Sequence, residues 1–227
     1  MGCKNPSGQN KLGGIIMTSE TRSVRESAFS KTVLKNLETS LASAYGKEKA
    51  AVIFEQASAI LNDELINMDD RGNKAIRKHL SDFILPGFAC YKALQETGIH
   101  SEEAFEFVSK EVYKTAEEMG NTMKKFKNLP FAYGLMRLFA KHIMKYGFPK
   151  EGWTIIWKEN NSKRVSFDMT SCLYCEELKK RNAFELCPAF CESDHVSYDP
   201  LSPKIVFKRT GTMAYGNKDC DFCFEKG

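Results

Sequence analysis

The stretch Trp153–Met169, WTIIWKENNSKRVSFDM, decides the fold class of this chain. Its first five residues are aromatic or β-branched, which favours a strand. Asn160-Asn161-Ser162 is typical of a turn, and residues 165–169 predict a second strand, so the stretch predicts a β-hairpin. Two further strands are expected over residues 205–207 and 221–224.

Apolar residues recur at helical spacing before this hairpin and predict a series of helices. The expected helices cover about 27–45, 48–67, 73–85, 88–97, 101–120 and 121–146. Pro86-Gly87 is expected to break the third, Gly120 to end the fifth, and Pro130 to interrupt the last. Short helices are expected over 173–181 and after Cys187.

Helices first and strands later predict an α+β fold. We expect an N-terminal helical region packed on a small C-terminal antiparallel sheet with short helices. The expected divisions are a flexible N-terminus over 1–25, a helical region over 26–147, and a cysteine-rich α+β region over 148–227 that forms one compact unit with the helices.

Charge and hydropathy limit the partners that we expect. The chain has 227 residues and a formal net charge of +4, too small to indicate nucleic acid binding. No stretch approaches the roughly 18 apolar residues of a membrane-spanning helix, and the start lacks the apolar core of a secretory signal. We therefore expect a cytoplasmic protein with a small-molecule substrate, no nucleic acid partner and no membrane; a homo-oligomer is left open.

Cysteines are concentrated in the last quarter of the chain, in three close-spaced pairs: Cys172/Cys175, Cys187/Cys191 and Cys220/Cys223. Two C-x-x-C pairs are typical of zinc sites. However, positions i and i+3 of a regular strand point to opposite faces, so Cys220 and Cys223 would not share an ion. We expect no cofactor, with zinc as the alternative, held by ligands drawn from Cys172, Cys175, Cys187, Cys191 and His195.

The middle pair belongs to a denser group. On a helix, Cys187, Cys191, Asp194 and His195 stand at i, i+4, i+7 and i+8, so all project from one side. Such a group can bind a transition metal, or it can combine a nucleophilic thiol with acid–base partners. Alternatively, the two cysteines are small buried hydrophobes and Asp194-His195 is a polar helix end.

The C-terminal part contains four distinctive elements: Cys172-Leu-Tyr-Cys175, Glu185-Leu-Cys-Pro-Ala-Phe-Cys191-Glu-Ser-Asp194, Phe207-Lys-Arg-Thr-Gly-Thr-Met-Ala-Tyr-Gly216 and Cys220-Asp-Phe222-Cys-Phe224. In this order they resemble the signature of the L-2-amino-thiazoline-4-carboxylic acid hydrolase family. The resemblance covers roughly the last 60 residues. It implies a hydrolase that opens a small cyclic amidine, in the named reaction converting 2-aminothiazoline-4-carboxylate to N-carbamoyl-cysteine.

The resemblance also implies roles for residues within the matching segments. Cys191 is the candidate nucleophile and Asp194 the candidate general acid or base, with Cys220 and Asp221 as second candidates. Arg209 and Thr210 are the candidates for binding the substrate carboxylate, because an arginine can bind a carboxylate through two hydrogen bonds.

A non-catalytic function is the alternative. A helical part over a sheet with a cysteine-rich end is also similar to ligand-binding domains of the 4-vinyl-reductase type. That similarity implies a small-molecule-binding or sensor domain with structural zinc bound by cysteines.

Overall fold

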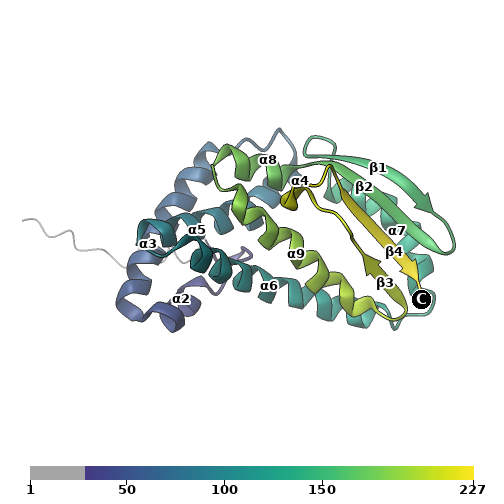
Figure 1. Cartoon of the computed structure of the whole chain (residues 1–227), viewed down its shortest axis with the longest axis horizontal. Helices are drawn as coiled ribbons and strands as arrows, with labels where there is room; N and C mark the ends of the chain where they lie inside the picture. The colour runs from purple at the N-terminus through teal and green to yellow at the C-terminus, as the bar shows by residue number, and fades with distance from the viewer. Residues whose placement is uncertain (1–28) are drawn as a thin grey trace, which may run out of the picture.

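A computed structural model describes residues 29–227 and confirms the α+β fold (Figure 1). The predicted flexible segment 1–25 lies outside the described residues, as does Cys3. The helices are α2 (Leu37–Tyr45), α3 (Lys47–Asn67), α4 (Lys74–His79), α5 (Leu85–Glu96), α6 (Ser101–Phe126), α7 (Ala132–Gly147), α8 (Leu173–Lys180) and α9 (Cys187–Tyr198). The strands are β1 (Trp153–Asn160), β2 (Arg164–Cys172), β3 (Ile205–Lys208) and β4 (Cys220–Lys226).

Three of the predicted helix boundaries are wrong. The helix expected over about 27–45 begins only at Leu37 as α2, because residues 31–36 form turns. Pro86 does not break the chain's helical course, because a π-helical turn (Leu80–Ile84) leads directly into α5 and Pro86 lies in the first turn of α5. Pro86 has no N–H for the carbonyl of Asp82 four residues earlier, and this carbonyl instead accepts from the Val33 N–H at 2.7 Å. Gly120 does not end α6, which continues to Phe126. The predicted interruption at Pro130 is confirmed, since α7 begins only at Ala132.

Gly120 has a packing role instead. Helices α6 and α9 lie side by side along the middle of the molecule (Figure 1). A Cβ atom at position 120 would stand 2.7 Å from the carbonyl oxygen of Val196 and 3.2 Å from Cγ of Pro200. Glycine therefore permits the close approach of α6 to α9, the helix that carries Cys187, Cys191 and Asp194.

The four strands form an antiparallel sheet in the order β1-β2-β4-β3. Burial alternates along β2 and β4, so one face is covered and the other is open. Phe167 and Phe222 stack on the covered face with ring centroids 5.2 Å apart. Cys220 lies on this face, whereas Asp221 and Cys223 point to the other, as the strand alternation predicts for Cys220 and Cys223.

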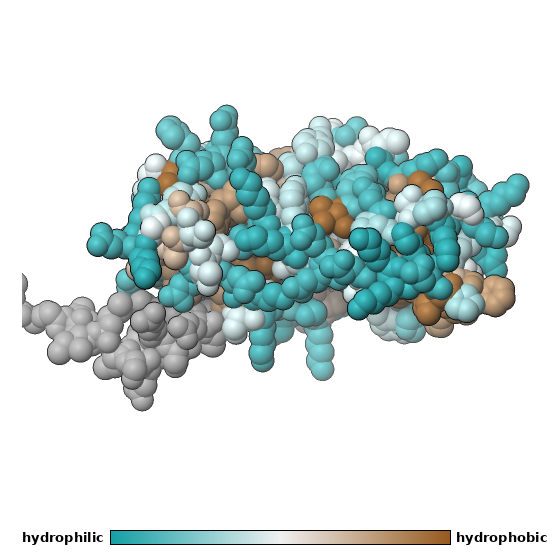
Figure 2. Space-filling view, turned by 90° about the horizontal axis from the view of Figure 1, so that it is seen from below, coloured by the Kyte–Doolittle hydropathy of each residue, from teal (hydrophilic) through white to brown (hydrophobic). Residues whose placement is uncertain are grey.

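The surface seen from below is largely hydrophilic, with hydrophobic patches near its middle and at its right-hand end (Figure 2). Helix α7 exposes Leu138, Phe139, Ile143 and Tyr146. None of the helices within residues 29–227 combines the length and apolar character needed to cross a bilayer.

Candidate functional site

Five cysteines from four helices and strands of the C-terminal region gather beneath the covered face of the sheet. Cys172 ends β2, Cys175 lies in the first turn of α8, Cys187 and Cys191 belong to the first half of α9, and Cys220 begins β4. The sulfur atoms of Cys175 and Cys187 are 3.3 Å apart. Hydrogen bonds also link Cys172 to Cys175 and Cys187 to Cys191. We call these five residues the cysteine cluster.

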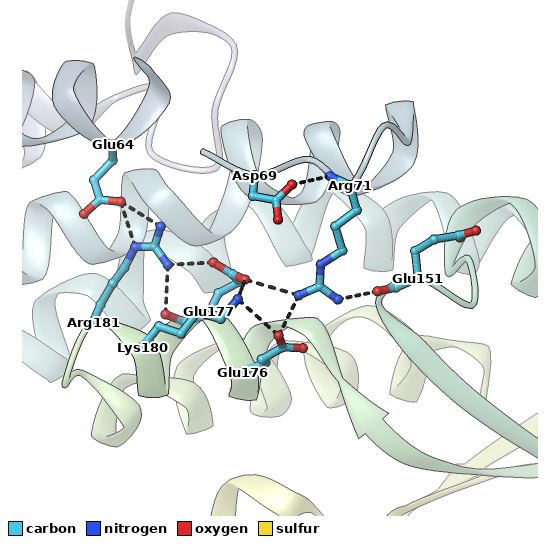
Figure 3. A network of polar contacts seen from close by, with 8 residues as sticks. All are labelled: Glu64, Asp69, Arg71, Glu151, Glu176, Glu177, Lys180 and Arg181. Carbon is cyan, nitrogen blue, oxygen red and sulfur yellow. Dashed lines mark hydrogen bonds and ion pairs between the residues drawn. The ribbon is translucent and has the colours of Figure 1, made fainter. Parts of the chain in front are cut away.

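Helix α8 is held in place by a network of ion pairs that joins it to the helical region (Figure 3). Glu177, only 5% exposed, accepts hydrogen bonds from Arg71, at 3.3 Å, and from Arg181, at 2.7 Å. Arg181 in turn pairs with Glu64 of α3 at 2.7 Å, and Arg71 pairs with Glu176 at 2.8 Å. The network fixes the first turn of α8, and with it Cys175.

Helix α9 is tied to the loop after β3 by Arg209. Its Nη1 donates to Asp194 Oδ2 at 2.6 Å, and its Nη2 donates to the backbone carbonyl of Cys191 at 2.8 Å. The Arg209 side chain is only 3% exposed. A buried guanidinium therefore fixes the turn of α9 that carries both the candidate nucleophile and the candidate acid–base residue.

Thr212 connects two thiols of the cluster. The thiol of Cys220 donates to Thr212 Oγ1 at 3.4 Å, and the Thr212 hydroxyl is also hydrogen-bonded to Cys191. Thr212 is 5% exposed, yet it lines a cavity of about 150 Å³. This cavity is bounded by Glu192, His195, Arg209, Thr210, Gly211, Thr212, Tyr215 and Asn217. The cysteine cluster and the cavity therefore meet at Thr212 and Arg209.

A larger cavity, of about 450 Å³, lies between α7 and β1. Its lining includes Lys141, Tyr146, Trp153 and Trp157 but no cysteine. We place the candidate site at the smaller cavity, because the candidate nucleophile Cys191 and the candidate acid–base residue Asp194 both contact Arg209 in its wall, although neither is among the lining residues.

Hydrogen bonds between the thiols shift the pKa values of the cysteines in opposite directions. Donation from the thiol of Cys187, and then from the Thr212 hydroxyl, lowers the pKa of Cys191 against the opposing effect of burial. Donation from Cys172 and Cys187 likewise lowers the pKa of Cys175. The pKa of Cys187 is raised, because Cys175 and Cys191 share its single thiol proton and because the thiol is buried. Cys187 thus keeps its proton while Cys175 and Cys191 are stabilised as thiolates.

Asp194 is poised for proton transfer near neutral pH. Burial raises the pKa of Asp194 to about 6, although the nearby Arg209 guanidinium opposes this rise. A carboxyl group with a pKa close to the working pH can both give and take a proton during a reaction.

The remaining predicted residues lie at the edges of the site. Asp221 faces away from Cys220; it accepts hydrogen bonds from the Thr210 backbone N–H at 2.9 Å, the Thr210 hydroxyl at 2.6 Å and the Gly211 N–H at 2.6 Å. Asp221 and Thr210 together shape the loop that carries Arg209. His195 lines the cavity, and its Nδ1 lies 3.3 Å from Asp199 Oδ1.

Sequence reasoning missed Thr212 as a site residue, although it stands in the Arg-Thr-Gly-Thr run quoted above. A second threonine three residues after the arginine was the available signal. It also missed the contact between Cys175 and Cys187, because the loop from Arg181 to Leu186 that brings them together carries no pattern that fixes its path.

Within the part of the chain that the structure describes, no group of three or more His, Cys, Asp or Glu side chains is arranged to hold a metal ion. Cys223 lies on the open face of the sheet, away from the cluster. The zinc alternative stays a prediction.

A comparison with protein-family models matches residues 77–224 to L-2-amino-thiazoline-4-carboxylic acid hydrolase. The match covers about two thirds of the chain and includes helices α5 to α9, strands β1 to β3, and β4 as far as Phe224. No curated protein and no solved structure matches the chain.

Proposed function

The chain belongs to the L-2-amino-thiazoline-4-carboxylic acid hydrolase family, and from this premise we propose that it hydrolyses a small cyclic amidine of the 2-aminothiazoline-4-carboxylate type. The observation that carries the proposal is the link made by Arg209. One guanidinium contacts both the Asp194 carboxyl group and the Cys191 main chain, at the wall of a cavity.

In the first step, the Cys191 thiolate attacks the ring carbon between the sulfur and the two nitrogens. The protonated amidine makes this carbon electrophilic. The tetrahedral centre collapses by breaking the bond from that carbon to the ring sulfur, which leaves as a thiolate and takes up a proton. The product of this step is an S-alkyl isothiourea, in which the Cys191 sulfur is bonded to the former ring carbon.

In the second step, water attacks the same carbon. The Asp194 carboxylate accepts a proton from this water, and the Cys191 thiolate leaves. The released product is an N-carbamoyl amino acid with a free thiol, so the overall reaction adds one water. Hydrogen bonds from Cys187 and Thr212 to Cys191 stabilise its thiolate both before attack and on departure.

Arg209 is also the proposed contact for the substrate carboxylate. Two of its five N–H groups are used by Asp194 and the Cys191 carbonyl, and Nη2 also lies 3.8 Å from Glu192 Oε1. Because the guanidinium and Glu192 both line the cavity, an incoming carboxylate would replace Glu192 beside Arg209. Thr210 lines the cavity beside it and orients the loop through Asp221.

The test is turnover of L-2-amino-thiazoline-4-carboxylate by the full chain, followed by mass-spectrometric detection of N-carbamoyl-cysteine. The Cys191→Ala variant should retain its fold and lose turnover. The matched control is Cys223→Ala, which removes a thiol from the open face of the sheet and should act as the wild type. Full turnover by Cys191→Ala would refute the thiol mechanism, and no product from the wild-type protein would refute this substrate.

A further inference from the structure

The cysteine cluster holds more thiols than the proposed hydrolysis uses. That mechanism requires the sulfur of Cys191, whereas Cys175 and Cys187 lie beside it with no part in bond making. Both are buried, and their sulfur atoms are in direct contact at 3.3 Å. A pair of thiols at this separation can form an intramolecular disulfide, which a single thiol cannot.

The contact between Cys175 and Cys187 lies at the first turns of two helices. Cys175 stands in the first turn of α8 and Cys187 is the first residue of α9, so the amino ends of both helices meet at the two sulfurs. The positive ends of helix dipoles favour a thiolate over a thiol. The hydrogen bonds from Cys172 and Cys187 add to this stabilisation of the Cys175 thiolate.

The two sulfurs already lie close to bonding distance. A disulfide has its sulfurs about 2.05 Å apart, so the 3.3 Å contact must shorten by roughly 1.2 Å. The ion-pair network around Glu177 holds α8, and with it Cys175, beside the start of α9.

We infer that Cys175 and Cys187 are a reversible dithiol that hydroperoxides oxidise to a disulfide. The Cys175 thiolate attacks an oxygen of the hydroperoxide: an S–O bond forms, the O–O bond breaks, and the leaving oxygen takes up a proton to give an alcohol or water. The Cys187 thiol then attacks the Cys175 sulfenic acid and expels water. The two thiols lose two electrons, and the hydroperoxide gains them.

Oxidation of Cys187 would affect the hydrolase site by removing a hydrogen-bond donor next to Cys191. The Cys187 thiol has one proton, which Cys175 and Cys191 share, and a disulfide-bonded sulfur has no proton to give. The Cys191 thiolate then loses a stabilising donor, so oxidised protein should turn over more slowly than reduced protein. This consequence rests on the proposed function, whereas the disulfide itself does not.

The experiment maps the bond on the full-length protein. Reduced protein is treated with hydrogen peroxide, chosen because it is small enough for a buried pair, and free thiols are blocked before peptide mapping. We expect one disulfide, Cys175–Cys187, that dithiothreitol reverses. It should persist in Cys172→Ser and Cys223→Ser, while Cys187→Ser should leave a sulfenic acid on Cys175 that dimedone labels.

Three results would overturn the inference. One is a bond between Cys172 and Cys175, or between Cys187 and Cys191, in place of the expected pair. Another is a cluster whose thiols all remain reduced at peroxide concentrations that oxidise Cys223. The third is a co-purified metal ion that shields the thiols until a chelator removes it. The mapping requires no turnover, so its failure and the failure of the hydrolase assay are separate outcomes.

Discussion

Replacing Arg209 with Met should destabilise the protein and do so in a pH-dependent way. The change keeps much of the side chain's volume but leaves the Asp194 carboxylate without its cation and the Cys191 carbonyl without its donor. Removing one partner of a buried ion pair costs about 3–5 kcal/mol. Because the Asp194 side chain is 31% exposed and keeps some hydration, we expect the lower end, about 3 kcal/mol at pH 8.

The sign of the pH dependence follows from Asp194. Its pKa in the folded protein is raised to about 6, so the folded state holds this proton more tightly than the unfolded state does. The protonated Asp194 carboxyl group therefore adds to the free energy of unfolding at low pH, and this contribution is lost as the pH rises through about 6. Without Arg209 the pKa rises further, so the destabilisation by Arg209→Met should be smaller at pH 5 than at pH 8.

Urea denaturation at the two pH values measures this effect, with an unchanged m value as the check on two-state behaviour. The neighbouring Lys208→Met variant is the matched control: Lys208 pairs with Glu225 on the exposed surface, so its loss should lower the free energy of unfolding much less than Arg209→Met does. The double variant Asp194→Asn/Arg209→Met should lose less unfolding free energy than the two single variants lose together. If Arg209→Met lowers the free energy of unfolding by less than about 0.5 kcal/mol, and equally at both pH values, Arg209 does not stabilise the fold through Asp194.

Three further predictions concern α9 and its contacts. Asp194→Asn should lower kcat about 10²–10⁴-fold and abolish the fall in wild-type kcat below pH 6 that the pKa of Asp194 predicts, as a pH profile of turnover would show. Gly120→Ala should destabilise by about 1–3 kcal/mol in urea, because its Cβ would stand 2.7 Å from the Val196 carbonyl oxygen; a gain in stability would contradict the close helix contact. Thr212→Val should raise the pKa of Cys191 and slow its alkylation at neutral pH, and an unchanged rate-against-pH curve would contradict the hydrogen bond.

Local patterns were sufficient to predict the secondary structure of the cysteine-rich region. The hairpin over Trp153–Met169 could be predicted because aromatic and β-branched residues flank an Asn-Asn-Ser turn. The helix starting near Cys187 could be predicted from Pro188, whose missing N–H suits a first turn. The opposite orientation of Cys220 and Cys223 follows from strand geometry alone.

Long-range contacts could not be predicted in this way. Gly120 looks like a helix end until α9 packs against it, and only then does the missing Cβ become a packing requirement. Asp221 looks like a partner for Cys220, but its carboxyl group is used by the loop that begins at Thr210. The approach of Cys175 to Cys187 depends on the position of α8, which the buried Glu177 fixes through ion pairs. Local residue spacing does not predict these pairs, because Arg71 is distant from Glu177 in the sequence.

Trapping of the reaction intermediate on the enzyme tests the central claim most directly. The full chain is mixed with L-2-amino-thiazoline-4-carboxylate, quenched in acid within the first turnover, digested and analysed by mass spectrometry. We predict that the peptide containing Cys191 carries the mass of the opened substrate, attached at that sulfur. An adduct on Cys220 or Cys175, or rapid product formation with every cysteine unmodified, would contradict the assignment of Cys191 as the nucleophile.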